Sequence, residues 1–169
     1  MNRIVKFCCF IEKISEWVGK QIAWLTTALV LIICWDVSQR YVFKTSTAAM
    51  LEMEWYLFSI IFLMAAGYTL KHDKHVRVDV FYARMSPQQQ AWIDLVGTLI
   101  FLIPFCLVVI YGAYKYTLVS FNYNESSPDA GGLPARYLIK AVIPIGFLFL
   151  LFQSFAFGLR AYLTIKQAS

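Results

Sequence analysis

The sequence has few charged residues for its length. Asp, Glu, Lys and Arg make up 15% of the 169 residues, whereas an average soluble domain has about 25%. Hydrophobic residues make up 60%, compared with about 45–50% in soluble domains. We therefore expect a single membrane domain over residues 1–169, with no room left for a soluble catalytic domain.

Residues that hold metals or redox groups are also scarce. The only histidines, His72 and His75, lie in a polar segment, and the four cysteines include no C-x-x-C pair. Lys and Arg form no long run, so the net charge of +5 indicates membrane orientation more than binding to nucleic acid. We expect no catalytic residue, no cofactor, no metal and no nucleic-acid partner.

Four stretches without charged residues or histidine predict four transmembrane helices. They cover residues 21–35, 55–70, 95–114 and 141–159. A spanning helix needs about 20 mostly apolar residues, so polar ends are included, and the expected spans are about 21–43, 51–70, 88–116 and 137–160. The predicted fold class is an all-α membrane protein, a bundle of four transmembrane helices.

The basic residues predict the orientation of this bundle. Cytoplasmic segments of membrane proteins are enriched in Lys and Arg. One side of the predicted membrane collects Arg3, Lys6, Lys13, Lys20, Lys71, Lys74, Arg77, Arg84, Arg160 and Lys166. The other side holds Arg40, Lys44, Lys115, Arg136 and Lys140. Both termini should therefore face the cytoplasm.

Two further segments have the spacing of amphipathic helices. Before the first span, apolar residues recur at helical intervals: Ile4, Phe7, Cys8, Ile11, Ile14 and Val18. This pattern fits an amphipathic N-terminal helix at the membrane surface, and equally an extension of the first span. Between the second and third spans, a short interfacial helix is predicted by Val78, Phe81, Tyr82 and Met85.

The third span has a recognisable start. Ser86 is a favourable N-cap, Pro87 fits the first helical position, and Gln89 can complete a capping box. The third span should therefore begin near Ser86.

Charged residues at the ends of the first two spans are the candidate functional residues. Asp36 and Arg40 are four apart with the acid first, which favours a helical ion pair. Glu52 and Glu54 are separated by about 200° around a helix, so one can be buried while the other meets water. A membrane acid can be functional, but all of these lie near helix ends, and we favour capping, packing or interface roles.

Several short motifs together resemble the small membrane subunit of tripartite ATP-independent periplasmic (TRAP) transporters, the DctQ-like or Q subunit. The motifs are Arg40-Tyr41-Val42-Phe43, His75-Val76-Arg77-Val78-Asp79, Glu125-Ser126, Gly132-Leu133-Pro134 and Pro144-Ile145-Gly146-Phe147. Each falls on the topological element where that family has it, and the resemblance covers most of the chain.

The resemblance implies a scaffold in the bacterial inner membrane. In that family a larger membrane subunit holds the substrate and sodium, and a periplasmic binding protein delivers an organic acid, such as sialic acid or a C4-dicarboxylate. The implied partners of this chain are that large subunit, that binding protein and membrane lipids. The alternative is a self-sufficient, proton-coupled four-helix exporter that uses Glu52 or Glu54.

The resemblance also suggests roles for the charged ends. As hypotheses, binding-protein docking is assigned to Arg40, Lys44, Asp129 and Arg136. The interface with the large subunit is assigned to Asp36, Glu52 and Glu54.

Overall fold

The structure, a computed structural model, describes residues 2–72, 82 and 84–168. Its helices are α1 (Asn2–Ser38), α2 (Ala48–Lys71), α4 (Pro87–Gly97), α5 (Ile103–Asn122) and α6 (Tyr137–Ala168), with π-helical turns η1 (Gln39–Phe43) and η2 (Thr98–Leu102). Most of the segment with the predicted short interfacial helix, including the motif at 75–79, lies outside the described residues. Helices are the only regular elements in the part of the chain that is described.

Four helical segments are long and apolar enough to cross a membrane. They are Cys8–Phe43, Ala48–Lys71, Pro87–Asn122 and Tyr137–Lys166. The prediction of an all-α chain with four membrane-spanning helices is therefore confirmed. Each segment exceeds the minimum of about 20 residues, and the first and third contain 36 residues each.

The N-terminal segment is continuous with the first span. Helix α1 runs without a break from Asn2 to Ser38. Its apolar face is used near the N-terminus, where Cys8 and Ile11 pack with Ala156 of α6. The two alternatives were a separate surface helix and an extension of the first span. The structure has the extension, with its apolar face against α6.

The predicted start of the third span is confirmed. Ser86 Oγ accepts a hydrogen bond from the Gln89 amide at 3.3 Å, and Gln89 Oε1 accepts one from the Ser86 amide at 2.9 Å. Farther along, the π-helical turn η2 ends just before Pro104. Proline has no N–H and its ring crowds the carbonyl four residues earlier, so a local widening of the helix relieves the clash.

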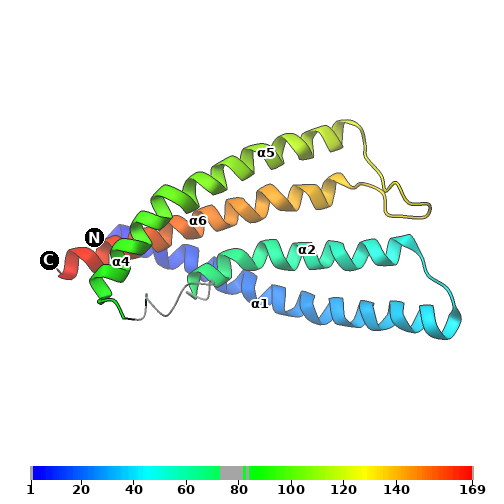
Figure 1. Cartoon of the computed structure of the whole chain (residues 1–169), viewed down its shortest axis with the longest axis horizontal. Coiled ribbons are helices and arrows are strands. Elements are labelled where there is room, and N and C mark those ends of the chain that lie inside the picture. The colour runs from blue at the N-terminus through cyan, green and yellow to red at the C-terminus, as the bar shows by residue number, and fades with distance from the viewer. Residues whose placement is uncertain (1, 73–81, 83, 169) are drawn as a thin grey trace.

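Helix α6 is the central element of the bundle. Helices α5 and α2 lie on either side of it, α1 lies beyond α2, and the N-terminal part of α1 also reaches α6 (Figure 1). In the apolar part of the α6 span, 39% of the residues are buried inside the chain, compared with 6–11% in the other three spans. A core cluster joins α2, α5 and α6 through Leu70, Cys106, Leu150 and Leu151. The remaining helices therefore keep most of their apolar surface open.

Glycines bring α2 and α6 close together. A Cβ atom added to Gly146 would lie 3.0 Å from Leu63 Cβ and 3.1 Å from the Leu63 carbonyl oxygen. One added to Gly67 would lie 2.5 Å from the Phe149 ring. Small residues at such contacts allow close backbone approach in membranes, where packing drives helix association.

We predict that Gly146→Leu destabilises the chain by separating α2 from α6. Overpacking of a filled contact typically costs about 1–3 kcal/mol. The measurement is the unfolding midpoint in detergent, followed by circular dichroism. Gly112→Leu is the matched control, because nothing lies within 4 Å of a Cβ added to Gly112. Equal midpoints for the two variants would contradict the close packing.

Candidate functional site

The connections α1–α2 and α5–α6 lie at the same end of the molecule, opposite both termini (Figure 1). We call this the loop end, defined by residues 44–47 and 123–136. The four residues predicted to dock a binding protein belong to it or border it: Arg40, Lys44, Asp129 and Arg136.

A buried carboxylate holds the α5–α6 loop against α2. Glu52, in the second turn of α2, is 4% exposed. Its Oε1 accepts a hydrogen bond from Ser127 Oγ at 2.5 Å, and its Oε2 accepts one from the Leu133 amide at 2.6 Å. The Ser127 amide also donates to the Leu133 carbonyl at 3.1 Å. Because hydrogen bonds to a carboxylate are stronger than neutral ones, Glu52 clamps both arms of the loop.

The clamp explains the glycines between those arms. A Cβ atom on Gly132 would lie 2.3 Å from Ser127 Oγ and 2.9 Å from Glu52 Oε2. Gly131 has φ +77°, a conformation that side chains disfavour. The motif at residues 132–134 is thus the segment that lets the loop approach the carboxylate.

A second contact fixes the base of the same loop. Glu125 forms an ion pair with Lys140 of α6, and the Lys140 Nζ lies 4.0 Å from the centroid of the Tyr116 ring. The hydrogen bond from Lys140 holds the pKa of Glu125 below its usual range. The ion pair therefore contributes fully above the ordinary carboxyl pKa and is lost as the pH falls through the lowered pKa.

The predicted ion pair at the end of the first span is confirmed. Arg40 donates to Asp36 Oδ2 at 2.6 Å, and the side chains are 46% and 3% exposed respectively. Beyond it, Lys44 is exposed and ends the π-helical turn with φ +52°, its amide donating to the Gln39 carbonyl. Asp36 therefore has its partner inside the chain, while Arg40 and Lys44 are exposed on the surface of the subunit.

The other predicted residues differ in exposure. Asp129 is exposed at the tip of the α5–α6 loop. Arg136 is half-buried, with its guanidinium carbon 5.8 Å from the centroid of the Trp55 ring. Glu54 is half-buried, and its Oε1 is buried with no hydrogen-bond partner within the described part of the chain. Asp129 and Arg136 therefore belong to the same loop end. Glu54, unlike Glu52, has no bond to that loop in the described structure.

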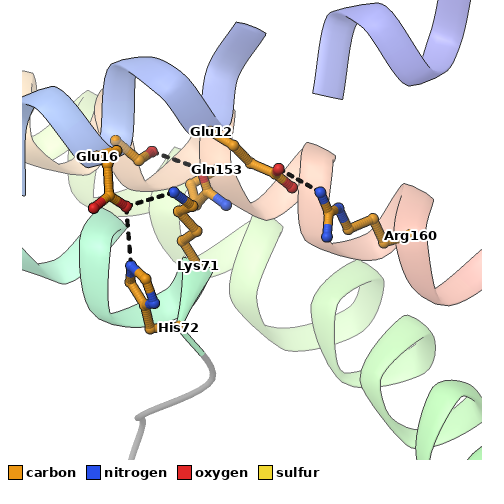
Figure 2. Close-up of polar contacts among 7 residues, drawn as sticks. Glu12, Glu16, Lys71, His72, Gln153 and Arg160 are labelled. Atoms are coloured by element: carbon orange, nitrogen blue, oxygen red, sulfur yellow. Dashed lines mark hydrogen bonds and ion pairs between the residues drawn. The ribbon is translucent and has the colours of Figure 1, made fainter. Parts of the chain in front are cut away.

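The opposite end carries a polar network that the sequence analysis missed. Figure 2 shows Glu16 of α1 bound to Lys71 and His72 at the end of α2, at 2.6 and 3.2 Å. Nearby, Glu12 of α1 pairs with Arg160 of α6. These contacts tie the N-terminal part of α1 to both other helices.

A buried hydrogen bond completes this network. Ser15 Oγ donates to Gln153 Oε1 at 2.6 Å, and the two residues are 0% and 2% exposed. The sequence feature that could have predicted this network is the spacing of Glu12, Ser15 and Glu16, which places the three side chains on one face of the helix. Among residues 2–72, 82 and 84–168, no group of three or more His, Cys, Asp or Glu side chains is arranged to hold a metal ion.

Comparison with known proteins identifies the family. A search of curated proteins gives no significant match. A family model described as "Tripartite ATP-independent periplasmic transporters, DctQ component" matches residues 29–163, which include the loop end, the Glu52 clamp, the second part of the first span, the whole second and third spans and most of the fourth. This chain therefore belongs to the DctQ family and is a small membrane subunit of a TRAP transporter.

Proposed function

We propose that this subunit is the non-catalytic scaffold of a sodium-coupled transporter that takes up organic acids such as sialic acid or C4-dicarboxylates. It supports the large membrane subunit and helps dock the periplasmic binding protein. The observation that carries the proposal is the Glu52 clamp, because it holds the α5–α6 loop against α2 and so fixes the loop end in one shape. The sodium coupling and the substrate class rest on the family resemblance.

In this proposal the loop end faces the periplasm and both termini face the cytoplasm. The basic residues support this orientation, since ten of the fifteen flank the terminal side. A multi-pass protein of the inner membrane then offers its clamped loop to a soluble periplasmic partner.

The docking surface consists of Arg40, Lys44 and Asp129, which are all exposed. A rigid loop binds with a smaller loss of conformational entropy than a mobile one. Charges of both signs at the rim of an interface orient the partner and accelerate association. We leave Arg136 out of this surface, because its guanidinium lies over the Trp55 ring.

The large subunit covers part of the open apolar helix faces, and lipids cover the rest. Of the three acids assigned to that interface from the sequence, Asp36 and Glu52 have partners inside the chain. Glu54 is the one we retain, because its buried Oε1 lacks a hydrogen-bond donor in the described structure. In this arrangement the small subunit enlarges the fixed part of the transporter, against which the substrate site of the large subunit moves.

We predict that reversing two exposed charges, Lys44→Glu with Asp129→Lys, slows association of the binding protein by about tenfold at low salt. The effect shrinks as salt rises, because exposed charges are screened. Surface plasmon resonance on the assembled transporter measures the rate. Arg40 stays unchanged, since its loss would leave the buried Asp36 without a partner.

Lys20→Glu is the matched control for this experiment, because Lys20 is exposed on α1 near the opposite end. Its association rate should equal that of the wild type. A double variant that also matches the wild type would refute docking through the loop end.

We predict that Glu52→Gln loosens the α5–α6 loop without unfolding the helices. The amide carries no charge and replaces one of the two accepting oxygens by an NH2 group, so both hydrogen bonds lose their charge assistance. A hydrogen bond to a charged group contributes about 1.5–3 kcal/mol. The Leu133 amide should then exchange its hydrogen about tenfold faster or more, since 1.4 kcal/mol corresponds to tenfold. Glu54→Gln is the control and should leave the exchange of Leu133 unchanged.

We predict that the purified subunit alone transports nothing across a liposome membrane. Organic-acid uptake should appear only when the large subunit and the binding protein are added, and should follow a sodium gradient. Proton-driven transport by the chain alone, abolished by Glu52→Gln or Glu54→Gln, would instead establish the self-sufficient exporter.

A further inference from the structure

A groove opens between α2, α5 and α6 next to the loop end. Its volume is about 400 Å³, within the range of about 300–1,000 Å³ of pockets that hold small molecules. The part farther from the loop end is lined by apolar side chains: Phe58, Phe62, Leu63 and Ile143. The part nearer the loop end is lined by Trp55, Tyr116, Arg136, Ile139 and Lys140.

The two cations in the groove differ in their partners. Lys140 is paired with Glu125 and is 9% exposed. Arg136 takes part in none of the ion pairs found among the described residues, and its guanidinium lies over the Trp55 ring. Arg136 therefore presents, at one end of an apolar groove, a planar cation that none of the described carboxylates binds directly, although Glu52 and Glu125 lie near enough to interact with its charge. A guanidinium binds phosphate through two parallel hydrogen bonds, which an ammonium group cannot match.

The aromatic residues indicate the depth of Arg136 in the membrane. Trp55 and Tyr116 are side chains of the kind that gather at the level of lipid headgroups. The rings of Phe58 and Phe62 are stacked with centroids 6.3 Å apart and are 59% and 68% exposed. They lie farther along α2, so they face hydrocarbon. A phosphate at the depth of Arg136 and an acyl chain beside the two Phe rings match this profile.

We propose that this groove is a specific site for one phospholipid of the leaflet at the loop end. Its phosphate binds Arg136, and one of its acyl chains lies along Phe58, Phe62 and Ile143. Helices α2 and α5 both pack on α6, so the acyl chain fills the space between them. Basic pockets between transmembrane helices bind lipid headgroups by the same chemistry.

The direct test is native mass spectrometry of the purified full-length chain in detergent. Dioleoyl phosphatidylglycerol should bind as one saturable molecule. Dioleoylglycerol lacks the phosphate and glycerol 3-phosphate lacks the acyl chains, so both should bind at least about tenfold more weakly. Equal binding of dioleoylglycerol, or no saturable binding of the phospholipid, overturns the proposal.

Variants separate the headgroup contact from the acyl groove. Arg136→Gln removes the charge and Ile143→Trp fills the groove, and each should weaken phospholipid binding by about tenfold or more. Arg136→Lys keeps the charge and should lose less. Lys115→Gln is the matched control, because Lys115 lies 4.4 Å from the Tyr111 ring centroid, outside the groove lining. Unchanged binding in both Arg136→Gln and Ile143→Trp, or an equal loss in Lys115→Gln, refutes the site.

A cross-link in the assembled transporter distinguishes lipid from protein as the occupant. A photoreactive benzoylphenylalanine at position 143 should yield the chain with the added mass of one phospholipid. Covalent attachment to the large subunit instead would show that a protein helix fills the groove, and would overturn the proposal.

Discussion

A polar group that lies within a membrane protein must find its partner inside the protein, because hydrocarbon supplies none. The chain meets this constraint in two ways. Hydroxyl groups within the helices donate to the carbonyl four residues earlier, as Thr26, Ser59 and Ser154 do. The acids and amides at the ends form longer-range contacts between helices. The polar contacts that tie the chain together therefore concentrate at the two ends, and the middle is held by apolar packing.

This distribution explains how so thin a bundle keeps its shape. The α6 span alone has a substantial buried fraction, so apolar packing inside the chain is limited. Glu52 fixes one end by tying the α5–α6 loop to α2. At the other end, the contacts of Ser15 and Glu16 tie α1 to α6 and to α2. With α6 held at both ends, sliding of α2 along it would require both sets of contacts to break.

The sequence predicted those features whose determinants lie close together in the chain. The four spans follow from apolar length, the start at Ser86 from its capping box, and the Asp36–Arg40 pair from a four-residue spacing. The Glu52 clamp was beyond such rules, because its partners Ser127 and Leu133 lie 75 and 81 residues away. Residues so far apart in sequence meet only because α2 packs closely on α6, and that packing depends on Gly67 and Gly146.

Because the partners of Glu52 lie far away in sequence, its role in holding the α5–α6 loop is visible only in the structure. From the sequence, Glu52 and Glu54 were equivalent acids at the start of a span, and the helical angle showed only that they face different ways. The structure gives Glu52 two donors from one loop, whereas Glu54 keeps a buried oxygen without a donor in the described chain. An acid with its bonds filled serves the shape of its own subunit. A half-buried acid with an open acceptor can take a donor from another molecule, and this is why the contact with the large subunit is proposed at Glu54 and not at Glu52.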